Sequence, residues 1–175
     1  METMETLCRR KSVRTYTGEA PTAEQMERIL KAAQAAPVAM ARFDSMHLTV
    51  ITNPELLAEL EAAGAAELGK PGKMLYGAPV LVLVSAKIPA GAENPMYSSA
   101  AMVVHNMALE ATELGVGSVD IWGCIRGASK DAARVAKLQL PEGVEPCCAI
   151  ALGQTDEEFP VRDVPADKMA VSAIQ

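Results

Sequence analysis

A short segment near the start of the chain, Arg9–Arg14 (RRKSVR), gathers four cations and one hydroxyl within six residues. In an extended backbone Arg10, Ser12 and Arg14 point to the same side, because successive side chains of a strand alternate. Two guanidinium groups and a hydroxyl that converge on one point form a site for a phosphate. The spacing alone also allows, and somewhat favours, a solvated basic patch that complements the carboxyl end of a short helix. A nuclear-localisation signal is a further interpretation that nothing else in the sequence supports.

The other residue types offer little for catalysis by the protein itself. The two histidines, His47 and His105, fall at the start of a predicted strand and inside an apolar helix, where structural roles are expected. The cysteines form neither a CxxC motif nor a Cys/His metal spacing, so we expect reduced thiols and no metal site. Neither GxGxxG nor GxxxxGKS/T occurs, which excludes a Rossmann turn or a P-loop. The cysteines are Cys8, Cys124, Cys147 and Cys148.

Length, charge and hydropathy place the chain in a broad class. The 175 residues correspond to a single domain, 1–175, that can bury an ordinary core. The net charge of −6 disfavours nucleic acids and anionic membranes as general partners. The start, METMET, is acidic and no apolar stretch follows it, so we expect no signal peptide. No run approaches the ~18 apolar residues of a membrane span. We therefore expect a cytoplasmic protein.

Hydrophobic periodicity predicts the helices and strands that would position these groups. Helices are predicted over residues 3–10, from Thr22 to Pro37, from Asn53 to Leu68, over Tyr97–Leu114, and from a cap at Ser129 to Leu138. Strands are predicted at Leu48–Thr52, Val80–Ser85, Val119–Trp122 and Cys147–Leu152. The Val-rich run Val80–Ser85 is typical of a strand buried on both faces. The small apolar helix Tyr97–Leu114 is expected to be central or to pack against another protein surface.

The sequence resembles the nitroreductase family of FMN-dependent oxidoreductases in four segments that follow one another in the family's order. RRKSVRTY at 9–16 is similar to the family's opening, and Ala36-Pro37 is similar to the loop before its first strand. Lys73-Met74-Leu75 resembles the segment under the flavin pyrimidine. LGVGS at 114–118, followed by VDIWG at 119–123, resembles the helix exit and the strand at the flavin edge. Together the four segments cover nearly the whole chain.

The resemblance implies a fold and an assembly. The fold would be α+β, with a central mixed sheet of about four to five strands flanked by helices. The family forms a domain-swapped homodimer with an FMN site at each side of its interface. Pro37, Val38 and Ala39 would then reach the flavin of the partner subunit. Relatives commonly read Ala-Pro-Ser-x-x-Asn there, whereas this chain reads APVAMA at 36–41, so that a hydroxyl and an amide are absent.

The resemblance also implies roles at the phosphate end of the cofactor. Arg10, Lys11 and Ser12 would hold the phosphate and ribityl side of FMN. Arg14 stands at a position that is basic in the family. Lys70 stands where relatives often carry an asparagine.

Further roles are implied at the flavin ring and in the tail. Lys73 would lie near flavin N1 and the C2 carbonyl, where a fixed cation stabilises the negative charge of the reduced ring. Gly123 would offer its backbone N–H near N5, and Trp122 would contact the flavin edge or the substrate, unless it belongs to the core. A late basic residue, Arg162 or alternatively Lys168, would close on the phosphate. The chemistry is then carried by N5 of FMN, and no side chain is expected to act as a catalyst.

These expectations describe an FMN-dependent oxidoreductase that moves electrons from NAD(P)H to a nitroaromatic, quinone or similar acceptor by a ping-pong mechanism. A different flavin reduction on the same fold, such as dehalogenation or enone reduction, would need a substrate lid that this length argues against. A non-catalytic flavin- or phosphate-binding module is the alternative from another class. The sequence separates neither NADH from NADPH nor one acceptor from another.

Overall fold

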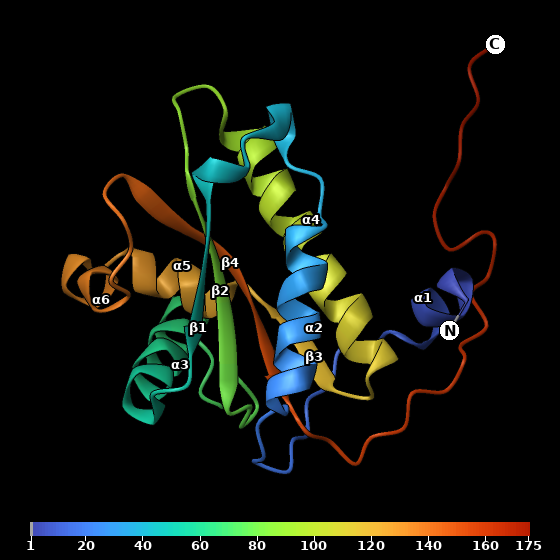
Figure 1. The fold of residues 1–175 in the computed structure, drawn as a ribbon, viewed down its shortest axis with the longest axis horizontal. Coiled ribbons are helices and arrows are strands. Elements are labelled where there is room, and N and C mark those ends of the chain that lie inside the picture. The colour runs from blue at the N-terminus through green and yellow to red at the C-terminus, as the bar shows by residue number, and fades with distance from the viewer. Residues whose placement is uncertain (1) are drawn as a thin grey trace.

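The computed structural model describes residues 2–175 as helices packed on both sides of one sheet (Figure 1). The helices are α1 (Thr3–Arg9), α2 (Ala23–Gln34), α3 (Pro54–Leu68), α4 (Glu93–Glu113), α5 (Gly123–Ser129) and α6 (Ala132–Lys137). The strands are β1 (Met46–Ile51), β2 (Val80–Lys87), β3 (Gly117–Ile121) and β4 (Val144–Gly153). Two 3-10 turns, η1 (Ala39–Ala41) and η2 (Phe43–Ser45), precede β1. The α+β fold expected from the sequence is confirmed.

The sheet has the strand order β1-β2-β4-β3, and every pair of neighbouring strands is antiparallel. β2 and β3 run in the same direction, but β4 lies between them and pairs with both. The expectation of a mixed sheet is therefore wrong for residues 2–175 of this chain. The physical reason is that the last strand, β4, inserts between β2 and β3 and runs antiparallel to both. β2 and β3 therefore never pair with each other.

The two faces of the sheet bury two separate hydrophobic cores. Side chains of β2 alternate between the cores: Val80, Val82 and Val84 pack with α2 and α4, whereas Leu81 and Leu83 pack with α3 and α5. Figure 1 shows α2 and α4 to one side of the sheet and α3 and α5 to the other. The five side chains are almost completely buried, which confirms the prediction of a strand covered on both faces.

Side-chain caps account for the first turns of α2, α3 and α6. Thr22 accepts a hydrogen bond from the Gln25 N–H at 3.2 Å, and the Gln25 side chain accepts one from the Thr22 N–H at 2.8 Å, so the expected capping box is present. The predicted cap at Ser129 is wrong, because Ser129 ends α5. Asp131 caps the next helix instead, since its carboxylate accepts a hydrogen bond from the Ala133 N–H at 3.0 Å.

Helix α5 was not predicted, and close contact with α3 explains why it forms. Its two glycines, Gly123 and Gly127, lower its intrinsic helix propensity. A Cβ added at Gly127 would lie 2.2 Å from the Ala63 carbonyl oxygen. From the other side, a Cβ added at Gly64 of α3 would lie 2.8 Å from the Cys124 Sγ. Glycine thus allows the two helices to approach closely, and tertiary packing overrides the local preference.

The chain leaves the body of the protein after β4. Residues 154–162 run along one end of the sheet, and the remainder extends away from it as coil (Figure 1). The apolar side chains Met169, Val171 and Ile174 of this tail are almost fully exposed. Between residues 2 and 175, no helix combines the length and the apolar character needed to cross a membrane.

We expect Gly127→Ala to lower the free energy of unfolding by about 1–3 kcal/mol, the usual cost of overpacking. The added methyl group cannot be placed without moving α5 away from α3. Urea unfolding followed by circular dichroism measures the change. Ser129→Ala, on the exposed side of the same helix, is the matched control and should shift the free energy by less than about 0.5 kcal/mol. Equal curves for the two variants would contradict this account of α5.

Candidate functional site

The basic segment, residues 9–14, is fixed to the edge of the sheet through its buried valine. The Val13 N–H donates to the Ser118 carbonyl oxygen at 2.8 Å, so the segment runs beside β3. Val13 is fully buried, and the Tyr16 hydroxyl donates to its carbonyl oxygen at 3.2 Å. Because side chains alternate in extended backbone, anchoring Val13 inward directs Ser12 and Arg14 away from the core.

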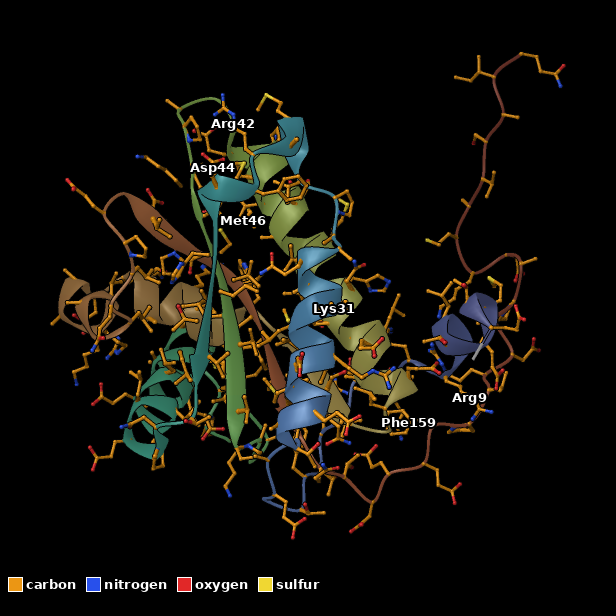
Figure 2. All side chains as sticks on the ribbon, viewed as in Figure 1. Arg9, Lys31, Arg42, Asp44, Met46 and Phe159 are labelled. Carbon is orange, nitrogen blue, oxygen red and sulfur yellow. The ribbon has the colours of Figure 1, made fainter. Side chains whose placement is uncertain are left out.

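The cations of this segment differ in whether they already have partners. Lys11 Nζ lies 2.8 Å from a Glu157 carboxylate oxygen, and this hydrogen bond is the main cause that lowers the pKa of Glu157. Arg9 donates to the Phe159 carbonyl oxygen, and Figure 2 shows these two residues side by side between α1 and the tail. Within the described residues, the Arg10 guanidinium and the Ser12 hydroxyl have no hydrogen bond or ion pair. These two groups remain available to an anion.

The turn after α3 brings the predicted ring-contacting lysine toward the basic segment. The Arg14 guanidinium lies 5.6 Å from the centre of the Tyr76 ring. Tyr76 adopts a left-handed conformation, with φ of 58°, and its N–H donates to the Lys73 carbonyl oxygen at 3.4 Å. Lys73 and Lys70 are exposed, and in the part of the chain that is described their ammonium groups make no ion pair. Lys73 therefore belongs to the same end of the sheet as Arg14.

The structure separates the two late basic residues proposed for the phosphate. Arg162 binds the last turn of α1: its Nε donates to the Cys8 carbonyl oxygen at 2.8 Å, and its Nη2 donates to the Leu7 carbonyl oxygen at 3.2 Å. This places Arg162 beside the residues that precede Arg10. Lys168 lies farther along the extended tail, where only its backbone N–H is bonded, to the Pro165 carbonyl oxygen at 3.2 Å. Of the two, Arg162 is the one held beside the basic segment.

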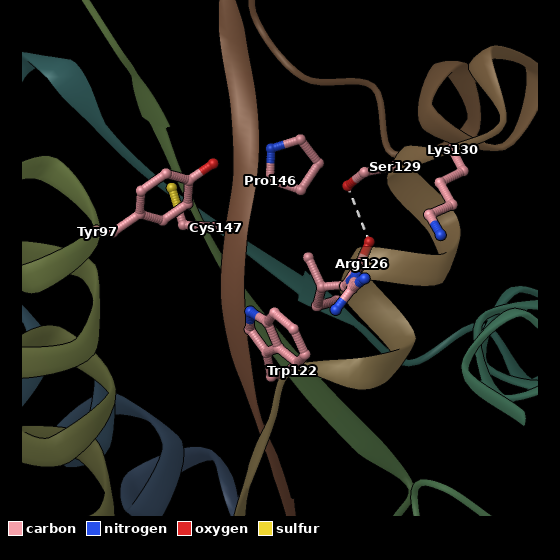
Figure 3. Close-up of a pocket in the computed structure, with 8 residues that line it drawn as sticks. Tyr97, Trp122, Arg126, Ser129, Lys130, Pro146 and Cys147 are labelled. Atoms are coloured by element: carbon pink, nitrogen blue, oxygen red, sulfur yellow. Dashed lines mark hydrogen bonds between the residues drawn. The ribbon is translucent and has the colours of Figure 1, made fainter. Parts of the chain in front are cut away.

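Trp122 and Gly123 lie at the other end of β3. Val13 binds Ser118, and Trp122 follows four residues later, which corresponds to about 13 Å along a strand. Trp122 is 54% exposed, and the Arg126 guanidinium lies 5.0 Å from the centre of its ring. A core role for Trp122 is therefore wrong. Its indole borders a cavity of about 480 Å³ between α4, α5 and β4 (Figure 3).

Pro37, Val38 and Ala39 do not join the other predicted residues within one chain. They follow the end of α2 at the top of Figure 1, whereas the chain between α1 and α2 descends to the lower end of the sheet. The Ala39 N–H donates to the Ser99 hydroxyl of α4 at 3.0 Å. Met40 and Ala41 are both left-handed, with φ of 55° and 53°, although neither is a glycine. A shared site would require the Pro37–Ala39 segment of a second copy.

Three residues of this region were missed by sequence reasoning. Glu157 neutralises Lys11, Tyr76 packs against Arg14, and Arg126 packs against Trp122. Only the last pair carried a local signal, because residues four apart on a helix are neighbours. The other two pairs join positions far apart in the chain, and no spacing rule finds them.

Known proteins are similar to this chain over most of its length. A model of the nitroreductase family matches residues 7–154. A protein of Methanothermobacter thermautotrophicus, provisionally named an NADH dehydrogenase/NAD(P)H nitroreductase, is 28% identical over 170 residues, which cover 94% of this chain and 83% of that protein. A protein of Archaeoglobus fulgidus with the same provisional name is 28% identical over 159 residues, covering 90% and 87%.

Solved structures show the same fold. A nitroreductase with bound FMN from Desulfitobacterium hafniense is 25% identical and superimposes with a TM-score of 0.83, covering 99% of this chain and 100% of that one. A nitroreductase with bound FMN from Bacteroides fragilis is also 25% identical, with a TM-score of 0.77 and the same coverage. The family model matches most of this chain, and the solved folds agree with nearly all of it. The chain therefore belongs to the nitroreductase family.

Proposed function

We propose that this protein is an FMN-dependent oxidoreductase that moves electrons from NAD(P)H to a nitroaromatic, quinone or similar acceptor. The observation that carries the proposal is a pair of groups without a partner among residues 2–175, the Arg10 guanidinium and the Ser12 hydroxyl, on a segment anchored to the sheet. The FMN found in related nitroreductase structures and the NAD(P)H in the names of relatives support it. A non-catalytic binding module has no observation in its favour beyond the altered turn at 36–41.

The residues fit the phosphate and the ring of FMN in different ways. Arg10 and Ser12 offer donors that no group among residues 2–175 satisfies, which suits a dianionic phosphate. Lys11 fits less well than the sequence suggested, because Glu157 already neutralises it. Arg162 is engaged by the α1 carbonyls and would contribute through its charge and by fixing the end of that helix. Lys168 is the weaker of the two tail candidates.

At the ring end, this chain supplies charge and one backbone donor. FMN, when bound, accepts and returns a hydride at N5. Lys73 would hold a positive charge near the pyrimidine edge, where negative charge develops on reduction. Gly123 is the first residue of α5, so its N–H has no acceptor inside the helix and is free to bind a ligand. The donor would leave before the acceptor binds, in a ping-pong cycle, and no protein nucleophile is required.

The proposed assembly is a homodimer in which Pro37, Val38 and Ala39 complete the site of the other copy. Two features support it. The tail exposes Met169, Val171 and Ile174 close together, and a second copy would cover this run of apolar side chains. Helix α4 also exposes part of its apolar surface, at Met102.

An anaerobic titration tests the proposed activity. The purified protein is loaded with FMN and titrated separately with NADH and NADPH while the flavin absorbance is followed. Bleaching by at least one nicotinamide, reversed by a nitroaromatic or quinone, is the expected result. Protein that never takes up FMN would overturn the proposal, and bound FMN that neither nicotinamide bleaches would favour the non-catalytic module.

Lys11 forms an ion pair with Glu157 and its neighbour Arg10 forms none within residues 2–175, which gives a sharper prediction. Arg10→Gln should weaken FMN binding about tenfold or more, because it removes a charge-assisted donor to the phosphate. Lys11→Gln removes the same charge one residue away and should weaken binding by less than about threefold, since Lys11 serves Glu157. Fluorescence titration of the apoprotein with FMN measures both constants. A larger loss for Lys11→Gln than for Arg10→Gln would reverse the assignment.

The tail prediction concerns assembly. A chain shortened by residues 166–175 keeps Arg162 but loses the exposed apolar residues, and we expect its dimer to dissociate at concentrations where the full chain is dimeric. Sedimentation velocity over a concentration series measures this. Asp167→Asn with Lys168→Gln, which changes the tail's charges and leaves its apolar residues, should remain dimeric. An unchanged dimer after truncation would contradict a role for the tail.

A further inference from the structure

We propose that the cavity beside Trp122 binds aromatic electron acceptors that carry a negative charge, such as aromatic carboxylates and sulfonates. This inference names the substrate class of the proposed oxidoreductase and rests on that function. The cavity begins at Trp122, directly before Gly123, which the resemblance assigns to the flavin edge. A ligand in it would therefore lie beside the redox centre rather than at a remote site.

The cavity exists because β3 is shorter than its neighbour. The β3–β4 pairing ends at Ile121 opposite Ala149, so the half of β4 from Val144 to Cys148 has no strand on this side. Pro146 lies in this unpaired stretch and has no N–H to offer to an added strand. The edge is therefore poorly suited to pairing with another chain. A small molecule fits better, since about 480 Å³ falls within the usual range of ligand sites.

Aromatic side chains from two elements line this space. Trp122 is 54% exposed and Tyr97, from α4, is 45% exposed. Figure 3 shows Tyr97 and Cys147 on one side of β4, with Trp122 and Arg126 on the other. The Arg126 guanidinium, 5.0 Å from the indole ring centre, restricts the positions that the indole can take. An exposed and restrained indole provides a surface on which a planar ring can stack.

The α5 side of the cavity carries an uncompensated positive charge. The Glu67 side chain is only 8% exposed, and its carboxylate lies 2.7 Å from Arg126 Nε and also contacts the Lys130 ammonium. The hydrogen bond from Lys130 lowers the pKa of Glu67, so the carboxylate is ionised at neutral pH. Two cations therefore share one anion. The terminal nitrogens of Arg126 have no other partner within residues 2–175, so they can donate to an anionic ligand.

The remaining groups of the cavity do not cancel this charge at the α5 side. Burial raises the pKa of the Cys147 thiol to about 11, so the thiol is neutral. The Ser129 hydroxyl donates to the Ile125 carbonyl oxygen at 2.8 Å and has no proton left for a ligand. The acidic neighbours lie near Tyr97: burial raises its pKa, and Glu145 and Glu93 raise it further. This asymmetry would orient an acceptor with its anionic group toward α5.

The kinetic test compares two nitroaromatics of the same size. 4-Nitrobenzoate is an anion and 4-nitrobenzamide is neutral. With the FMN-loaded protein, the double variant Arg126→Gln/Lys130→Gln should raise the KM for 4-nitrobenzoate about tenfold and change that for 4-nitrobenzamide by less than about twofold. Arg134→Gln/Lys137→Gln on α6 removes the same two charges outside the cavity and should alter neither KM. Equal effects on both acceptors would overturn the inference.

A binding measurement gives a second readout that needs no turnover. Trp122 is the only tryptophan in the chain, so its fluorescence reports on this cavity alone. Without nicotinamide, 4-nitrobenzoate should quench it at lower concentration than 4-nitrobenzamide in the unmodified protein. Added salt should reduce that preference. Equal quenching by the two compounds would overturn the inference without any variant.

The two measurements distinguish failure of the inference from failure of the proposed function. Quenching that prefers the anion in a protein whose FMN is never bleached would support the site and reject the oxidoreductase. Turnover of both acceptors with no preference in KM or quenching would reject the site and support the oxidoreductase.

Discussion

The position of β4 between β2 and β3 determines where both halves of the proposed site lie. One end of β4 leads the chain back to the basic segment: the Gln154 N–H donates to the Glu19 carbonyl oxygen at 2.8 Å, and the Thr155 hydroxyl donates to the Thr15 carbonyl oxygen at 2.7 Å. Its other end extends past β3 and leaves the edge that borders the cavity at Trp122. If β4 lay at the edge of the sheet, it would neither return the chain to residues 15–19 nor leave an unpaired edge beside Trp122.

The distribution of charge around β3 determines where anionic ligands can bind. The chain is acidic overall, yet cations with nitrogens left for a ligand lie near both ends of β3, at Arg10 and at Arg126. Two other cations at the same places, Lys11 and Lys130, are held by Glu157 and Glu67. Lys11 and Lys130 fix local structure through these ion pairs, whereas Arg10 and the terminal nitrogens of Arg126 can bind anions. The overall charge would repel nonspecific polyanions, and the local cations still attract small anionic ligands.

Periodicity and capping residues predicted the elements that local forces control. The two-sided burial of Val80–Ser85 and the capping box at Thr22 could be predicted because the signal lies within a few residues. Helix α5 could not, since GCIRGAS is a weak helix former that folds against α3. The Lys11–Glu157 pair could not either, because it joins residues that only the course of the tail brings together. The different roles of the cations in the basic segment therefore required the structure.

The turn after α2 shows how an altered pattern can keep its position in the fold. Serine and asparagine of the family pattern are absent at 36–41, but the Ser99 hydroxyl accepts a hydrogen bond from the Ala39 N–H. Ser99 is fully buried, and its own proton is donated to the Pro95 carbonyl oxygen at 2.8 Å, so the turn is held from α4. Two consecutive left-handed residues without glycine cost on the order of 1–3 kcal/mol each, and such strain persists only where surrounding structure enforces it. Because the Ala39 N–H already binds Ser99, this turn would contact the flavin of a second copy through apolar side chains. Its contribution to that site would then be shape and not hydrogen bonding.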